Sequence, residues 1–248
     1  MSVRPAASPA NANTPPIPRK KVTLATLNSL YASKTPIAML TAYDYPTALA
    51  VSSSPLTDIT LVGDSLAQVC LGLSSTTQLT LEDMIHHAKA VTRGTTHPFV
   101  VADMPFGSYH VSIEQAVTNA LRLVQEANVE AVKLEGGADI APIVRRLVQV
   151  GIPVMAHVGL MPQKHTALSG YKVQGRTAEG ARKLLRDALI LQDAGAFSTV
   201  VEAVPKELGQ YVTEKLSIPT IGIGAGPGTS GQVPPFPSLS VARANSPI

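Results

Sequence analysis

The sequence predicts an α/β fold and, within that class, a (βα)8 TIM-type barrel. Short apolar runs alternate with helical stretches between about residues 24 and 226, a pattern typical of parallel strands covered on both faces. The first run ends in Thr41-Ala-Tyr-Asp44 rather than in a glycine-rich phosphate loop, which disfavours an open Rossmann sheet. Acidic residues follow several of the runs, as they do at the mouth of a barrel enzyme.

Seven runs are expected to form strands. Each is short, rich in β-branched residues and almost continuously apolar, which is the composition of a strand buried on both faces. They span residues 37–42, 59–62, 99–102, 131–134, 154–156, 198–201 and 220–223.

Four stretches between these runs have the apolar spacing of helices and recognisable ends. Two of them follow a hydroxyl-bearing residue, Thr80 or Ser112. Asp83 and Gln115 come three residues after these, which is the spacing of a capping box. The other two are each closed by a glycine. The four helices are expected at residues 81–92, from residue 112 onward, at residues 139–150 and at residues 178–194.

Composition narrows the range of functions. The chain has 248 residues, of which 45% are hydrophobic and 15% charged, with a net charge of +3 and one cysteine. A single cysteine excludes a disulfide scaffold. The chain has no basic run of the kind that binds nucleic acid or an anionic membrane, and no apolar stretch approaches the roughly 20 residues of a membrane span. A small molecule is therefore the expected partner.

The two ends of the chain differ from the part between them, because they are rich in proline and lack periodicity. Residues 1–21 are expected to be a disordered or targeting tail, residues 22–232 the catalytic barrel, and residues 233–248 a divergent Pro/Ser-rich tail. No acidic residue precedes Asp44. A basic N-terminal segment without acidic residues is typical of a mitochondrial targeting peptide. Such peptides also form amphipathic helices, which the prolines here would hinder, so a cytoplasmic location stays open.

Charged side chains stand at the ends of successive predicted strands. In a barrel these ends share one mouth, so we expect the following side chains to converge there: Asp64, Asp103, Lys133, Glu135, His157 and Glu202. Crowded carboxylates repel each other unless a cation or a shared proton relieves them. Carboxylate oxygens without a cysteine cluster favour Mg²⁺. Lys133, one residue from a strand end, is expected to contact a substrate anion.

Several segments carry a resemblance to a known family. They are Thr41-Ala-Tyr-Asp44, Leu61-Val-Gly-Asp-Ser65, Ala102-Asp-Met-Pro-Phe106, Val132-Lys-Leu-Glu-Gly-Gly137, His157-Val-Gly-Leu-Met-Pro-Gln163, Gly170-Tyr-Lys-Val-Gln-Gly-Arg176, Val201-Glu-Ala-Val-Pro205 and Ile218-Pro-Thr-Ile-Gly-Ile-Gly-Ala-Gly226. These segments occur in this order over roughly residues 22–232, and through them the chain resembles the ketopantoate hydroxymethyltransferases. The resemblance implies a barrel enzyme of pantothenate and coenzyme A biosynthesis. Its members transfer a one-carbon unit from 5,10-methylenetetrahydrofolate to 3-methyl-2-oxobutanoate, giving 2-dehydropantoate, and assemble into large homo-oligomers.

The resemblance also implies roles for individual residues. Asp64 and Asp103 match the residues that hold Mg²⁺ in the family, with Glu135 completing the metal environment. Ser65 and Lys133 match residues that bind the keto acid, together with the two aspartates.

Two further residues are connected with proton transfer, one as the acceptor and one as its neighbour. Glu202 matches the family's proposed proton acceptor, and a carboxylate can take the C3 proton of a keto acid if its surroundings raise its pKa. His157 lies between the metal side and Glu202 in chain order, and we hypothesise that it orients or tunes this glutamate.

The resemblance ends after Gly231-Gln232, where the family continues with a strand and further helices. The tail that follows is rich in proline, which cannot donate to a strand ladder. We therefore expect the eighth strand and the C-terminal helices to be missing, leaving two unpaired edges. Two alternatives stay open: a truncated, non-catalytic isoform of the family, and a Mg²⁺-dependent barrel of the phosphoenolpyruvate mutase/isocitrate lyase type, although no active-site cysteine loop of that type surrounds Cys70.

Overall fold

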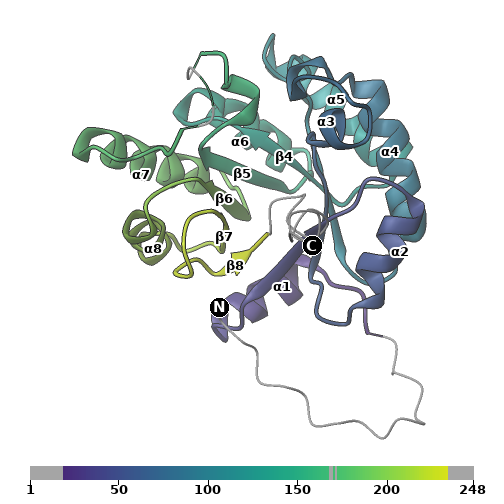
Figure 1. Ribbon diagram of the computed structural model, residues 1–248, viewed down its shortest axis with the longest axis horizontal. Coiled ribbons are helices and arrows are strands. Elements are labelled where there is room, and N and C mark those ends of the chain that lie inside the picture. The colour runs from purple at the N-terminus through teal and green to yellow at the C-terminus, as the bar shows by residue number, and fades with distance from the viewer. Residues whose placement is uncertain (1–18, 168–169, 171, 234–248) are drawn as a thin grey trace, which may run out of the picture.

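Eight parallel strands close into a barrel that is surrounded by helices (Figure 1). The computed structural model describes residues 19–167, 170 and 172–233. The predictions for residues 1–18 and 234–248, including the one about C-terminal helices, concern residues outside this described part. The strands are β1 Ile37–Thr41, β2 Ile59–Val62, β3 Phe99–Asp103, β4 Ala131–Glu135, β5 Val154–Gly159, β6 Ser198–Glu202, β7 Thr220–Ile223 and β8 Gly231–Gln232. The predicted barrel is confirmed, and the first seven strands start where the sequence placed them.

α1 precedes β1, and the other helices connect consecutive strands along the outside of the barrel. They are α1 Leu24–Ala32, α2 Tyr45–Ser53, α3 Leu66–Val69, α4 Leu81–Gly94, α5 Ile113–Ala127, α6 Ala141–Gln149, α7 Ala178–Asp193 and α8 Lys206–Lys215, with 3-10 turns η1 Thr76–Gln78, η2 Ala138–Ile140 and η3 Pro162–Lys164. Thr80 and Asp83 form the expected capping box, and Ser112 accepts a hydrogen bond from the Gln115 amide. Within the described ranges, no helix has both the length and the apolarity needed to cross a bilayer.

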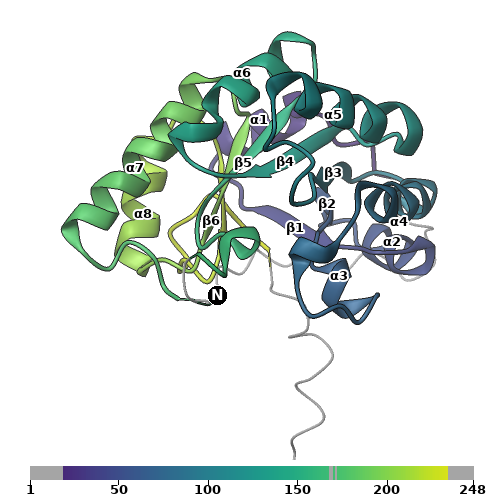
Figure 2. The same ribbon diagram turned by 90° about the horizontal axis from the view of Figure 1, so that it is seen from above.

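Two apolar layers hold this architecture together. Alternate strand residues such as Ile59 and Leu61 fill the barrel interior, and α1 adds Leu27 to the same cluster. The other strand faces pack against the outer helices in a second, larger cluster. Figure 1 shows α2 and α4 on one side of the barrel and α7 and α8 on the other, and Figure 2 shows α5 and α6 over β4 and β5. Burial on both faces explains why the strands are continuously apolar.

The expectation that the eighth strand is missing is wrong. β8 pairs in parallel with β1 and with β7, so the barrel has no open edge among the described residues. Two paired residues suffice because the flanking backbone extends the ladder: the Ile37 amide donates to the Ser230 carbonyl, and the Val233 amide donates to the Gly222 carbonyl. The first proline of the tail, Pro234, follows these donors and removes none of them. Residues 224–230 join β7 to β8 without a helix.

Closure at β8 depends on the absence of a side chain at Gly231. A Cβ at this position would lie 2.4 Å from the Ile37 carbonyl oxygen and 2.8 Å from the Ile221 Cδ1 atom. A Gly231→Ala substitution is therefore expected to destabilise the fold by about 1–3 kcal/mol, the usual range for overpacking. Thermal unfolding followed by circular dichroism measures this as a lower melting temperature. An unchanged melting temperature would contradict tight packing of β8 against β1.

The first residues that the structure describes contact the barrel through two ion pairs. The Arg19 guanidinium pairs with Asp58 and the Lys21 ammonium with Glu130. The Asp58 carboxylate is fully buried, and a buried carboxylate requires such a partner. These two ion pairs fasten residues 19–21 to the barrel.

Candidate active site

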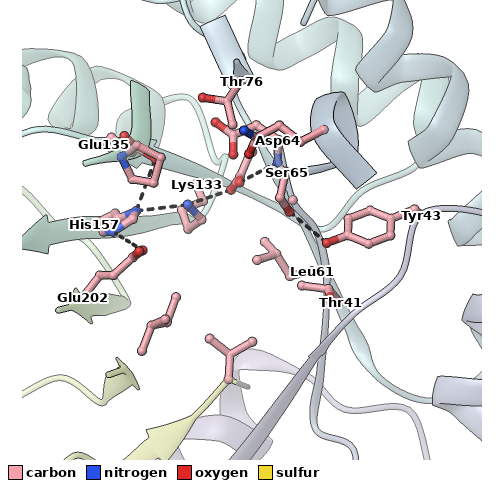
Figure 3. A pocket seen from close by; sticks show the side chains of 16 residues that line it. Thr41, Tyr43, Leu61, Asp64, Ser65, Thr76, Lys133, Glu135, His157 and Glu202 are labelled. Carbon is pink, nitrogen blue, oxygen red and sulfur yellow. Dashed lines mark hydrogen bonds and ion pairs between the residues drawn. The ribbon is translucent and has the colours of Figure 1, made fainter. Parts of the chain in front are cut away.

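A cavity of about 410 Å³ lies at the carboxyl ends of the strands (Figure 3). All seven residues singled out from the sequence line it: Asp64, Ser65, Asp103, Lys133, Glu135, His157 and Glu202. The expectation that these side chains converge is confirmed. Thr41, Leu61, Ile223 and Val233 also line the cavity and give it an apolar side. Figure 3 shows Thr41 and Leu61 lying apart from the pair formed by His157 and Glu202.

Strand geometry explains why these side chains meet. Asp103, Glu135 and Glu202 are the last residues of β3, β4 and β6. Successive side chains of a strand point to opposite faces, so Lys133 and Glu135 share the inner face of β4. His157 on β5 is paired in register with Glu135, which places the imidazole beside that carboxylate.

A chain of polar contacts crosses the site from β3 to β6. The Lys133 ammonium lies 2.9 Å from the Asp103 Oδ1 atom and 3.2 Å from the His157 Nδ1 atom. On the other edge of the imidazole, Nε2 lies 3.2 Å from the Glu202 Oε2 atom. An ammonium can only donate, so Nδ1 is the acceptor and the ring proton is on Nε2. This tautomer, assigned from the hydrogen-bond network, directs an N–H group at Glu202.

The charge states of the two central groups agree with this assignment. Burial by itself would lower the pKa of Lys133, but the carboxylates of Asp103, Glu135 and Asp64 raise it above its ordinary value. The pKa of His157 is lowered, first by burial and then by the Lys133 charge. The lysine is therefore charged and the histidine neutral at physiological pH.

The site contains more carboxyl groups than cationic groups. Burial, followed by the charge of Asp103, raises the pKa of Asp64 to about 7. The pKa of Glu135 is also raised, by burial and by the charge of Asp64. Lys133 is the only cation among the residues that line this cavity. An additional cation would relieve the repulsion between the carboxylates.

The donors present fit Mg²⁺ in part. Asp64 and Asp103 supply hard oxygen ligands and are close together, since the Asp64 amide donates to the Asp103 Oδ2 atom at 2.9 Å. Nowhere in the described part of the chain do three His, Cys, Asp or Glu side chains form a preassembled ion site. Mg²⁺ is commonly held by one or two carboxylates, with substrate and water completing its octahedron. A site formed by the two aspartates therefore suits Mg²⁺.

Three residues that sequence reasoning did not single out belong to this region. The Tyr43 hydroxyl lies 2.8 Å from the Ser65 hydroxyl, and Tyr43 lines the cavity. Gln163 is buried and contacts the carboxylates of Asp64 and Glu135, and the buried Tyr109 hydroxyl contacts the Glu135 backbone and the Gln163 side chain. Tyr43 and Gln163 belong to segments that resemble the family. Their side chains are neutral, so a search for charged residues at strand ends does not find them.

Solved structures with a similar shape confirm the barrel. A phosphonomutase from Burkholderia cenocepacia, described as putative, has a TM-score of 0.68 at 16% identity, with 89% of this chain and 96% of that chain covered. A 2,3-dimethylmalate lyase, described as a PEP mutase/isocitrate lyase superfamily member, has a TM-score of 0.63 at 20% identity, with coverage of 89% and 84%. At these identities the likeness concerns the fold alone.

Sequence relatives identify the family. Residues 21–236 match the family model described as ketopantoate hydroxymethyltransferase. A 3-methyl-2-oxobutanoate hydroxymethyltransferase of Emericella nidulans is 53% identical over 216 residues, which cover 87% of this chain but only 62% of that protein. The enzyme of the same name from Heliobacterium modesticaldum is 55% identical over 214 residues, covering 86% of this chain and 77% of the relative. This chain therefore belongs to the ketopantoate hydroxymethyltransferase family.

Proposed function

We propose that this chain transfers a hydroxymethyl group from 5,10-methylenetetrahydrofolate to 3-methyl-2-oxobutanoate, giving 2-dehydropantoate. The proposal rests on family membership and on one observation of the site. A carboxylate, Glu202, is held by a neutral imidazole at the edge of a cavity that also contains an ammonium and a pair of buried aspartates. These groups correspond to the needs of keto-acid enolisation: a base, an anion-binding cation and a place for a metal ion.

In the proposed reaction, Glu202 removes the proton from C3 of the keto acid. Its side chain is 17% exposed, whereas the His157 side chain is 2% exposed, so the glutamate is the member of the pair that a ligand can reach. The Nε2 atom of His157 lies 3.2 Å from this carboxylate, and we assign the imidazole the role of orienting it. The carbanionic C3 of the enolate then forms a bond to the methylene carbon of the folate, and the two C–N bonds of the methylene bridge break. Water supplies the hydroxyl group, and the C3 proton and the second proton of water go to the two folate nitrogens as tetrahydrofolate leaves.

The remaining residues bind and stabilise. We assign Asp64 and Asp103 to Mg²⁺, with Glu135 completing its surroundings. When bound, the ion supplies Lewis-acid stabilisation of the negative charge that develops on the keto oxygen. The Lys133 ammonium and the Ser65 hydroxyl bind the keto acid beside the aspartates.

One ground for the non-catalytic alternative was a barrel with open edges, and β8 closes the barrel. Its other ground, the expected loss of the C-terminal helices, concerns residues outside the described part of the chain. The phosphoenolpyruvate mutase type of chemistry is supported by fold likeness alone, at 16–20% identity in the two structures compared. The 52–55% identical relatives carry the hydroxymethyltransferase name.

Loss of the C3 proton signal of 3-methyl-2-oxobutanoate in D₂O, followed by NMR with Mg²⁺ and without folate, tests the first step. The wild-type chain is expected to exchange this proton. Glu202→Gln removes the base and is expected to slow the exchange at least about 10²-fold, the lower end of the usual contribution of general base catalysis.

Glu207→Gln is the matched control, since the Glu207 side chain on α8 is 75% exposed and its variant should exchange like the wild type. His157→Ala should also slow the exchange, because Glu202 loses its N–H partner. A folded wild-type protein without Mg²⁺-dependent exchange, or a Glu202→Gln variant that exchanges at the wild-type rate, would refute the proposed mechanism.

A further inference from the structure

We propose that Gln163 is a positioning residue that holds the carboxylates of Asp64 and Glu135 in place for Mg²⁺ binding. Gln163 lies on η3, directly after β5, and is 4% exposed. The inference rests on the proposed function, and it extends that function to a residue that touches the carboxylates rather than the reacting atoms.

Both polar parts of Gln163 contact a site carboxylate. The side-chain Nε2 atom donates to the Asp64 Oδ2 atom at 2.9 Å and to the Met104 carbonyl at 3.0 Å. The backbone amide of the same residue donates to the Glu135 Oε2 atom at 3.0 Å. One residue therefore supplies hydrogen bonds to two carboxylates that come from different strands.

The orientation of the amide follows from its neighbours. The Met104 carbonyl and the Asp64 carboxylate can only accept, so the NH₂ group of Gln163 has to face them. On the other side, the hydroxyl of Tyr109, which is fully buried in the loop after β3, lies 2.8 Å from the Gln163 Oε1 atom and 3.1 Å from the Glu135 carbonyl oxygen, and its one proton can serve either acceptor. The shorter contact favours Oε1, so Tyr109 supports the orientation that presents the NH₂ group to Asp64.

Barrel topology explains why such a bridge is needed. Asp64 follows β2 and Glu135 ends β4, and these strands are separated by β3. No ladder hydrogen bond joins β2 to β4 directly, so their relative placement at the mouth depends on the loops. Replacing a residue that orients a metal ligand through a hydrogen bond commonly lowers metal affinity about 10–100-fold.

The test is the dissociation constant of Mg²⁺ alone, measured by isothermal titration calorimetry on the full chain. Gln163→Leu keeps most of the side-chain volume but removes the donor to Asp64, and its Mg²⁺ dissociation constant is expected to rise about 10-fold or more. Tyr109→Phe keeps the donor to Asp64 but removes the hydroxyl that contacts Oε1, so it should raise the constant by a smaller factor. The deuterium exchange of both variants should recover as Mg²⁺ is raised to saturation.

Gln210→Leu is the matched control, because Gln210 also donates from Nε2 to a carboxylate, that of Glu214, but on the exposed surface of α8. Its Mg²⁺ affinity should equal that of the wild type. If Gln163→Leu unfolds, Tyr109→Phe decides the question. Wild-type Mg²⁺ binding that neither variant weakens would overturn this inference and leave the proposed function intact. A folded wild type that binds no Mg²⁺ would overturn both.

Discussion

A Lys133→Met variant is expected to lose deuterium exchange into 3-methyl-2-oxobutanoate by about 10²–10³-fold, the effect typical of removing one group that stabilises an anion in a transition state. Methionine keeps the length of the side chain but removes the ammonium that lies 2.9 Å from Asp103 and 3.2 Å from His157. The His157 Nδ1 atom then loses its donor, so nothing fixes the proton on the edge that faces Glu202.

The same substitution is expected to destabilise the fold. Removing one partner of a buried ion pair costs about 3–5 kcal/mol, because the other charge remains buried without compensation. Both side chains of this pair are at most 5% exposed. Thermal unfolding by circular dichroism and the NMR exchange assay measure the two effects separately.

A second variant and a control separate the two effects of this substitution. Asp103→Asn combined with Lys133→Met removes both charges, so it should recover much of the stability but none of the exchange. Lys89→Met removes an ammonium from the exposed pair with Glu126 and should change stability by about 1 kcal/mol or less. Wild-type exchange in a folded Lys133→Met variant would disprove the role of this lysine.

A Gly159→Ala variant is expected to lose stability and activity together. Gly159 ends β5 with a φ of +97°, in the left-handed region that other residues adopt at a cost of about 1–3 kcal/mol. A Cβ there would also lie 2.2 Å from the Glu202 carbonyl oxygen, and overpacking adds about 1–3 kcal/mol. Relief requires β5 and β6 to separate at the residue that carries the proposed base. Thermal unfolding and the exchange assay should both report the change.

A Gly151→Ala variant separates the effect of backbone strain from the effect of the steric contact with Glu202. Gly151 has a similar φ of +91°, but a Cβ there would meet no atom within 4 Å. This control should show the backbone strain alone and keep the wild-type exchange rate. Equal losses of stability in the two variants would mean that the contact with Glu202 contributes nothing.

Much of the fold could be predicted from the sequence, and the exceptions have physical reasons. Apolar runs and capping residues located seven strands and the helices α4 to α7, because these elements bury continuous surfaces. α1, α2, α3 and α8 were not predicted. α1 and α2 have nine residues each and little segregation of apolar side chains to one side, and α3 has only four residues. β8 was missed because two residues have no periodicity, and its pairing uses backbone atoms alone.

The candidate site was predictable to the extent that charge marks it. Glu135 and Glu202 stand at strand ends, and the topology of a barrel brings strand ends together. The tautomer of His157 could not be predicted, because it depends on which neighbour meets each ring nitrogen. Gln163 is neutral and lies on a short turn, so its contact with Asp64 follows only from the three-dimensional structure.

The brevity of β8 also bears on how the cavity changes with time. Local opening begins where the fewest backbone hydrogen bonds hold two segments together, and the seams of β8 with β1 and β7 each pair only two residues. Val233, one residue beyond β8, forms part of the apolar cavity wall. We therefore expect this seam to open more often than the longer, more fully paired strands that carry the polar chain from Asp103 to Glu202, and such opening would move the apolar wall of the cavity.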